Sequence, residues 1–256
     1  MQSLKEFVLN KKHFIVAHRG SSGNAPDNTI AAYKLAIEEG ADMIELDVQI
    51  TQDGVFVAYH DFIPLGLEKD FSDLKFEDIS KLDVGIGFDI KFKGETIPRL
   101  EDALALIQNK CYIILEIKTL AGSNFKENAD KLLELFEKYN YLDKTIFGSF
   151  NYSALLQLKK LNPAIHTAAI KIPLDNRLPS ELKNLIGCES YICSVEELND
   201  VMYEDAINSG IIMGVYSVDT KSQFKDAMKY NIRALGTNFP AKVKEWLNSG
   251  GGNTIG

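Results

Sequence analysis

The sequence predicts an α/β fold in which eight parallel strands and eight helices close into one barrel. Its 256 residues are 45% hydrophobic and 25% charged, an ordinary globular composition that excludes disordered, collagen-like, coiled-coil and small disulfide-rich chains. Runs rich in β-branched and aromatic residues alternate with stretches of helical spacing, which is the pattern of parallel strands joined by crossover helices. Because one such barrel takes about 250 residues, we predict a single domain over 1–248 and a flexible glycine-rich tail over 249–256.

The strand-like runs number nine, one more than the barrel needs, and a hairpin explains the excess. Asp53-Gly54 is flanked by strand-like residues and favours a two-residue turn, so 55–61 is expected to return antiparallel on 43–51. This register places Asp47 opposite His60. The predicted strands span 13–19, 43–51, 55–61, 111–118, 145–150, 165–171, 190–195, 212–218 and 232–239. The predicted helices span 28–39, 99–109, 125–139, 151–161, 180–187, 196–209, 221–230 and 240–248.

Residues 62–97 are longer than the loop that the barrel requires at this point. We expect an insertion or small cap at the mouth of the barrel, because loops of this length are commonly functional or mobile. Soluble proteins rarely expose large apolar patches, so its apolar side chains are expected to pack the cap onto the barrel. These side chains are Phe62, Ile63, Leu65, Leu67, Phe71, Ile86, Phe88 and Phe92.

The charge balance limits the partners that we expect. A formal net charge of -8 and a pI near 5.1 disfavour a nucleic-acid or anionic-membrane partner, since both require a basic surface. No signal-peptide core or membrane span is evident, so we predict a cytoplasmic protein that does not associate stably with membranes. A small anionic substrate would require a local pocket of positive charge.

Three acidic side chains on two predicted strands indicate a cation site. Glu45 and Asp47 are two residues apart in a strand and therefore share one face, and Glu116 on the next parallel strand can meet them. Three converging carboxylates cannot all stay ionised without a neutralising cation. An all-oxygen ligand set favours Mg²⁺, Ca²⁺ or Mn²⁺ over zinc. Salt bridges to Arg19 and Lys118 are the alternative interpretation.

Two histidines end strand-like runs near these carboxylates. The active sites of such barrels lie at the carboxyl ends of the strands, where His18 ends the first run and His60 ends the hairpin return. Histidine can accept a proton in one copy and donate one in another near neutral pH. We therefore predict that His18 and His60 form an acid–base pair. His13 and His166 lie at the opposite ends of their strands and are expected to be incidental.

Positive charge is expected at the same mouth, where it would bind a phosphate diester. Arg19 and Lys118 supply it, whether or not they also pair with the carboxylates. A turn-rich link leads into the first predicted helix, whose N-terminus Asp27 or Asn28 is expected to cap and whose free amides favour an anion. Tyr216 ends the penultimate strand at the same end of the barrel.

Together these motifs resemble those of the glycerophosphodiester phosphodiesterase family. They occur in the family's order and cover nearly the whole chain. The motifs are HRG at 18–20, APDNT at 25–29, IELDVQITQDG at 44–54, YHD at 59–61, PRLEDAL at 98–104, LEIK at 115–118, GSF at 148–150, VYSVD at 215–219 and GTNFP at 236–240.

The resemblance implies a (β/α)₈ TIM barrel with a small insertion after the HD motif. It also implies one divalent cation and hydrolysis of diesters such as glycerophosphocholine or glycerophosphoethanolamine to glycerol 3-phosphate and an alcohol. By resemblance, the site consists of the metal ligands Glu45, Asp47 and Glu116, the acid–base pair His18 and His60, and the phosphate-contacting Arg19 and Lys118.

The sequence departs from the family pattern in four places. Asp27 stands where the family usually has Glu, Tyr216 where Trp is common, and Asn238 where an Asp is usual. The RTT-like sequence expected soon after the HD motif is absent. These departures bear on the alcohol preference, including any substrate contact of Tyr216, more than on the reaction class.

Two other functions fit parts of the pattern. A phospholipase C- or D-like enzyme, or a lysophospholipase D, would share the barrel and the two histidines but would need an exposed apolar or basic rim. A non-catalytic barrel that binds a phosphate ligand is expected to have lost a histidine or a metal carboxylate, whereas all five of these residues are present.

Overall fold

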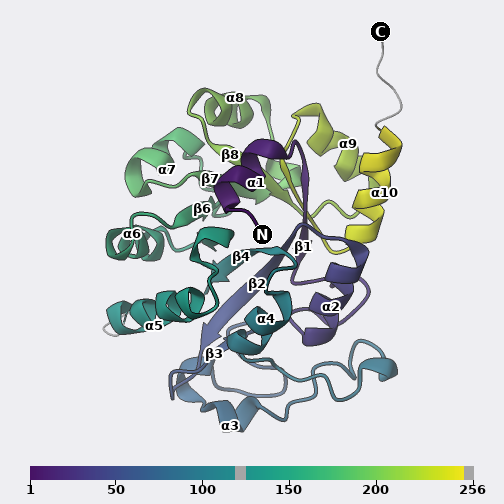
Figure 1. The fold of residues 1–256 in the computed structure, drawn as a ribbon, viewed down its shortest axis with the longest axis vertical. Helices are drawn as coiled ribbons and strands as arrows, with labels where there is room; N and C mark the ends of the chain where they lie inside the picture. Colours follow the sequence, from purple (N-terminus) through teal and green to yellow (C-terminus); the bar gives the residue numbers. More distant parts are fainter. Residues whose placement is uncertain (119–124, 251–256) are drawn as a thin grey trace.

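The computed structural model describes residues 1–118 and 125–250, and its nine strands form one closed sheet (Figure 1). The strand order is β1-β9-β8-β7-β6-β5-β4-β2-β3, and β1 also pairs with β2, so eight parallel strands close the barrel. The prediction of a (β/α)₈ barrel is therefore confirmed. The strands are β1 Phe14–His18, β2 Met43–Ile50, β3 Phe56–Ala58, β4 Tyr112–Ile117, β5 Thr145–Ser149, β6 His166–Ile170, β7 Ser190–Ser194, β8 Ile212–Tyr216 and β9 Ala234–Thr237.

Helices follow the barrel strands and surround them, as Figure 1 shows. All eight predicted helices are present, as α2 and α4 to α10. The helices are α1 Leu4–Asn10, α2 Ile30–Glu39, α3 Phe76–Ile79, α4 Leu100–Ile107, α5 Phe125–Lys138, α6 Tyr152–Leu161, α7 Pro179–Ile186, α8 Asp200–Asn208, α9 Lys221–Lys229 and α10 Pro240–Gly250. Short 3₁₀ turns lie at Phe71–Asp73, Ile90–Phe92, Leu142–Lys144 and Val195–Glu197.

The two faces of the strands build separate parts of the core. Outward side chains such as Ile44 and Leu46 pack against the helices, where they are fully buried. Inward side chains such as Met43 and Tyr112 fill the amino-terminal end of the barrel. The lumen is thus packed at one end, which leaves the carboxyl ends of the strands to form a site.

Helix α1 closes the amino-terminal end and was not predicted. Ser3 and Glu6 form a capping box: the Glu6 amide donates to Ser3 Oγ at 3.3 Å, and the Ser3 amide donates to Glu6 Oε2 at 3.1 Å. Phe7 stacks on Tyr112 with ring centroids 4.2 Å apart. Because the helix buries its apolar side chains against inward residues of the strands, it acts as a plug for the base of the barrel.

The hairpin exists, but its predicted register was wrong by one residue. Val48 pairs with Ala58, so Asp47 lies opposite Tyr59, and the Tyr59 amide donates to the Asp47 carbonyl at 3.1 Å. The loop contains three residues rather than two, closed by a bond from the Thr51 amide to the Val55 carbonyl at 3.0 Å. His60 therefore follows β3 at the mouth instead of facing Asp47 across the ladder.

The insertion at 62–97 has a small apolar cluster of its own. Phe71, Leu74 and Ile79 are buried there together with Val57 and Ile97. The expectation that the eight named apolar side chains pack the cap onto the barrel was wrong for five of them, which are exposed. These are Phe62 at 58%, Ile63 at 46%, Leu65 at 64%, Ile86 at 48% and Phe88 at 45%; Ile90, not among the eight, is also exposed, at 72%.

At the carboxyl end, α10 continues through Gly250, two residues into the tail predicted over 249–256. The rest of that predicted tail, 251–256, lies outside the described residues. Within the described ranges, no helix is both long and apolar enough to cross a bilayer.

Candidate active site

The strand register brings the three predicted carboxylates together at the mouth of the barrel. Asp47 on β2 pairs with Glu116 on β4, and Glu45 precedes Asp47 by two residues on the same face. One carboxylate oxygen from each lies within 4.8 Å of those of the other two, and all three side chains are buried. The sequence prediction that these residues converge is confirmed.

Two cations contact part of this cluster. Lys118 Nζ lies 3.0 Å from Asp47 Oδ1 and also pairs with Glu116 Oε1, while Arg19 Nε lies 3.3 Å from Asp47 Oδ2. The ion pairs of the alternative interpretation therefore form as well. If all five groups are ionised, three negative and two positive charges leave a net charge of -1.

The pKa values follow from this imbalance. Burial and the negative charges of Asp47 and Glu116 raise the pKa of Glu45 well above its ordinary value. Burial and Asp47 raise the pKa of Glu116 to about 7. For Asp47, burial is outweighed by Lys118 and Arg19, which lower the pKa. The cluster can thus be fully ionised near neutral pH only if another cation joins it.

Within the described ranges, an unpaired oxygen of Glu45 indicates where such a cation fits. Glu45 Oε2 accepts the backbone N–H of Arg19 at 2.9 Å, but Glu45 Oε1 is buried and has no hydrogen-bond partner among the described residues. This free oxygen faces an all-carboxylate set, which is the donor chemistry of Mg²⁺, Ca²⁺ or Mn²⁺. The residues present therefore fit a divalent metal.

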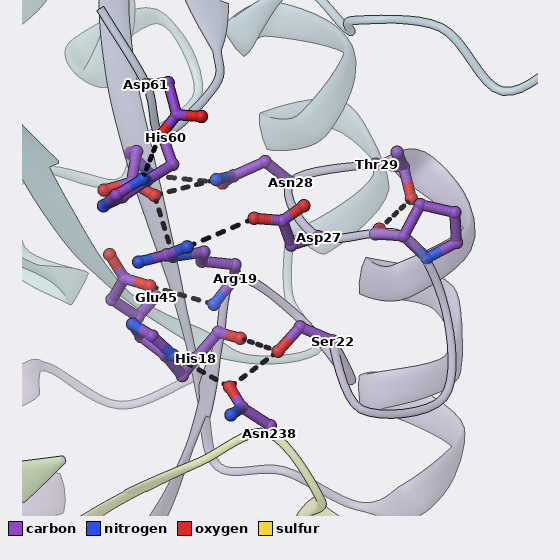
Figure 2. Close-up of polar contacts among 12 residues, drawn as sticks. His18, Arg19, Ser22, Asp27, Asn28, Thr29, Glu45, His60, Asp61 and Asn238 are labelled. Carbon is purple, nitrogen blue, oxygen red and sulfur yellow. Dashed lines mark hydrogen bonds and ion pairs between the residues drawn. The ribbon is translucent and has the colours of Figure 1, made fainter. Parts of the chain in front are cut away.

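The turn after β1 places Arg19 and its amide. Arg19 and Gly20 both adopt positive φ, 57° and 84°. A Cβ on Gly20 would lie 2.7 Å from the Ala32 backbone, so this position requires glycine. The turn directs the Arg19 amide to Glu45 and its side chain to Asp47 and Asp27, as Figure 2 shows for Glu45 and Asp27.

The Asn28 side chain bonds to both the backbone and the side chain of Asp47. Its Nδ2 donates to Asp47 Oδ2 at 2.8 Å, and its Oδ1 accepts the Asp47 amide at 3.2 Å and the Tyr33 hydroxyl at 3.1 Å. The expected capping role of Asp27 or Asn28 was wrong, because Thr29 caps α2 by accepting the Ala32 amide. Asn28 instead fixes the most buried of the three carboxylates.

His18 ends β1 and is held by an amide from the other end of the chain. Its Nδ1 lies 2.9 Å from Asn238 Oδ1, and Ser22 Oγ is within hydrogen-bond distance of both Asn238 Oδ1 and the His18 carbonyl (Figure 2). Burial and the charge of Arg19 lower the pKa of His18. The imidazole therefore tends to be neutral, which suits a proton acceptor.

His60 enters the same cavity from the loop after β3. Its Nδ1 lies 2.7 Å from Asp61 Oδ1. Gln49, on the same face of β2 as Asp47, donates to the Asp61 carbonyl at 2.9 Å and so ties this loop to the barrel. The two histidines thus reach one site from separate segments.

One cavity of about 230 Å³ lies among these groups. Its polar wall contains His18, Arg19, Glu45, His60, Glu116 and Lys118, and its opposite wall is apolar, with Ile170, Ile192 and Val215. Tyr216 also lines the cavity and stacks on His18 with ring centroids 6.1 Å apart. His13 and His166 contact Ile232 and Ser190 instead and do not line it.

Several residues around the site were not predicted in the roles that the structure gives them. Phe150, from the GSF motif, lines the cavity. Asn28 bonds to Asp47, Gln49 to the loop that carries His60, and Asn238 to His18. The HRG, YHD and GTNFP motifs contain or adjoin these contacts. Their pairings join residues far apart in sequence and appear only in the folded chain.

The family model described as "Glycerophosphoryl diester phosphodiesterase family" matches residues 18–242. A glycerophosphodiester phosphodiesterase of Caldanaerobacter subterraneus subsp. tengcongensis is 34% identical over an aligned length of 249 residues, and the alignment covers 94% of this chain and all of the relative. An Oleispira antarctica phosphodiesterase solved with the product sn-glycerol-3-phosphate is 24% identical, with a TM-score of 0.86, over 96% of this chain and 100% of that one. The Agrobacterium tumefaciens glycerophosphodiester phosphodiesterase is also 24% identical, with a TM-score of 0.79, over 91% and 99%.

The family match covers most of the chain, the relative at 34% identity covers nearly all of it, and seven of the nine motifs that resemble the family contribute residues to one cavity. The chain belongs to the glycerophosphoryl diester phosphodiesterase family of hydrolases.

Proposed function

We propose that this protein is a divalent-metal-dependent hydrolase of small glycerophosphodiesters such as glycerophosphocholine or glycerophosphoethanolamine. The products are glycerol 3-phosphate and the free alcohol. The observation that carries the proposal is a cluster of three carboxylates, two of which line one cavity together with two histidines and two cations. The Caldanaerobacter relative is a glycerophosphodiester phosphodiesterase and the Oleispira phosphodiesterase was solved with sn-glycerol-3-phosphate, and both point to the same chemistry.

Glu45, Asp47 and Glu116 would hold the metal, whose chemistry is to offset charge on the phosphoryl oxygens. Lys118 and Arg19 contribute to the same electrostatic stabilisation from their positions beside Asp47. Their pairing with carboxylates and their contact with phosphate are compatible, because a lysine ammonium has three donors and a guanidinium has five. A divalent ion would change the net charge of the five ionised groups from -1 to +1, so the loaded site would be positive in an acidic protein.

His18 and His60 would transfer the protons. One removes a proton from the attacking glycerol hydroxyl or water, and the other protonates the departing alcohol oxygen. Both line the cavity, and each has its Nδ1 fixed by a neighbour. A non-catalytic barrel would be expected to lack one of the two histidines or three carboxylates. All five are present and lie at the mouth of the barrel.

A second candidate substrate is a lipid diester such as a lysophospholipid. The observation that favours it is a shallow surface where His60, Asp61 and Lys118 adjoin the exposed Phe62 and Ile63. An acyl chain leaving the cavity would meet these side chains. The small size of the cavity and the polar wall around the reacting groups favour the water-soluble diester.

The test is release of glycerol 3-phosphate from glycerophosphocholine, compared with hydrolysis of detergent-dispersed lysophosphatidylcholine. We expect turnover of the first substrate, loss of that turnover in His18→Ala, and near wild-type turnover in the matched control His13→Ala. Faster turnover of the lysolipid would establish the second candidate. Absence of turnover with other glycerophosphodiesters and with lipids, in a folded and metal-supplemented protein, would instead support a non-catalytic binding barrel.

A further inference from the structure

The orientation of the Asn238 side chain is fixed by Asp219. Asn238 Nδ2 donates to Asp219 Oδ2 at 2.7 Å, and the Asn238 amide donates to Asp219 Oδ1 at 2.7 Å. Thr237 Oγ1 donates to the same carboxylate at 3.0 Å. An ionised carboxylate only accepts hydrogen bonds, so the NH₂ group of Asn238 must face Asp219 and its carbonyl must face His18.

This orientation determines which nitrogen of His18 carries a proton. Asn238 Oδ1 lies 2.9 Å from His18 Nδ1 and has only lone pairs to offer, so Nδ1 must be the donor. In a neutral imidazole the other nitrogen, Nε2, is then a free acceptor. His18 lines the cavity where the reacting diester would lie.

We propose that Asn238, held by Asp219, is a positioning residue that keeps the proton of His18 on Nδ1 and leaves Nε2 unprotonated. This inference rests on the proposed hydrolase function and adds a residue that orients one of its histidines. Neither Asn238 nor Asp219 lines the cavity, so both act through His18.

Kinetics on three variants test the proposal. Asn238→Leu keeps the branched shape but removes the acceptor, and we expect kcat to fall about 10- to 100-fold with KM nearly unchanged, less than the 10²–10⁴ that general acid–base catalysis contributes. The double variant D219N/N238D exchanges the amide and the carboxylate, restores an acceptor for Nδ1 and should recover most of the lost kcat. Asn208→Leu, on an exposed position of α8, is the matched control with wild-type kinetics.

The proposal is overturned if folded Asn238→Leu keeps its wild-type kcat, or if the double variant is folded and remains as slow as Asn238→Leu. A rise in KM with unchanged kcat in Asn238→Leu would also overturn the proposal, because that result indicates a role in substrate binding instead of proton transfer. Thermal unfolding of each variant shows whether it is folded.

The tautomer can be measured directly, without turnover. Long-range ¹H–¹⁵N NMR of the wild-type imidazoles, with His18 assigned by loss of its signals in His18→Ala, should give the pattern of a protonated Nδ1 and an unprotonated Nε2. A proton on Nε2 of neutral His18 would contradict the proposal even if the enzyme is active. An inactive wild-type protein with a protonated Nδ1 would instead refute the proposed function and leave the tautomer assignment supported.

Discussion

The two ends of the barrel use the same strands for opposite purposes. At the amino-terminal end, inward side chains such as Met43, Tyr112 and Ile146 pack with Phe7 of α1 into an apolar plug. At the carboxyl ends, the same faces of β2 and β4 carry Asp47 and Glu116. Moving four residues along one strand face, from Met43 to Asp47 or from Tyr112 to Glu116, changes a packed core into a charged site.

The apolar end of the barrel compensates for a site that is unfavourable for folding stability. Three buried carboxylates and two cations oppose stability unless they are paired, and burial already raises the pKa of Glu45 and Glu116. The plug and the helix-facing core supply apolar burial at a distance from that cluster. We therefore expect variants at the mouth to affect chemistry, and variants at the base to affect stability.

The largest expected effect is on turnover at the mouth. If His60 transfers a proton as proposed, His60→Ala should lower kcat about 10²- to 10⁴-fold, the range of general acid–base catalysis, because His18 would be the one histidine left in the cavity lining of the described residues. Steady-state kinetics measure this, with His13→Ala as the matched histidine variant. A loss of thermal stability comparable to the loss of activity would show that His60 is structural.

At the base, Phe7→Ala should reverse this pattern. Removing the ring that stacks on Tyr112 should lower the free energy of unfolding by about 3 kcal/mol, as for other large-to-small changes in a core. The kcat of the folded protein should remain close to the wild-type value. Denaturant unfolding measures the free energy of unfolding, and kinetics at a temperature where the variant is folded measure kcat. A large fall in kcat there would mean that the two ends are coupled.

Within the mouth, Glu116→Gln separates metal binding from proton transfer. The neutral amide is a weaker ligand, so the metal concentration for half-maximal activity should rise about 10-fold or more, since even loss of a ligand's supporting partner costs 10- to 100-fold in affinity. The exposed Glu204→Gln on α8 is the matched control. An unchanged metal titration would remove Glu116 from the proposed ligand set.

The smallest expected effect is a pH dependence of the metal-free protein. Because the pKa of Glu116 rises from 4.5 to about 7 on folding, the folded state holds more protons than the unfolded state between these values. Stability from this group is therefore present below about pH 4.5 and is lost as pH rises toward 7, and Glu45 acts in the same direction. Asp47, whose pKa is lowered, contributes stability that is lost only in more acidic solution.

Melting temperatures of chelator-treated protein at pH 5 and pH 7.5 measure this dependence. We expect a lower Tm at pH 7.5, a smaller difference in Glu116→Gln, and a larger stabilisation by added Ca²⁺ or Mg²⁺ at pH 7.5 than at pH 5, because metal competes with the protons. Identical pH dependence in the wild type and Glu116→Gln would contradict the assignment of Glu116 as the titrating group.

The barrel and the residues of the site could be read from the sequence, because both depend on short-range patterns. Alternation of strand-like and helical stretches predicted the fold, and a spacing of two placed Glu45 and Asp47 on one face. The hairpin register could not be read in the same way. Asp53-Gly54 is typical of a two-residue turn, but Thr51 Oγ1 bonds to Asp53 Oδ1 at 2.6 Å and accepts the Val55 amide, which closes a three-residue loop.

Helix α1 and the contacts that hold the site depend on tertiary structure. The seven residues of α1 are too few to be stable alone, so the helix forms where it can bury Phe7 on the barrel. Asn28 reaches Asp47 from a backbone with φ of 53°, and Asn238 reaches His18 across 220 residues of sequence. Such pairings follow from closure of the barrel and leave no local pattern.

The most direct test of a catalytic metal site is glycerol 3-phosphate release from glycerophosphocholine before chelation, after chelation and after Mg²⁺, Ca²⁺ or Mn²⁺ is restored. We expect chelator to abolish release and at least one of these ions to restore it in the wild type but not in His18→Ala. Release that persists in fully chelated, metal-free protein would contradict the assignment of the carboxylate cluster as a catalytic metal site.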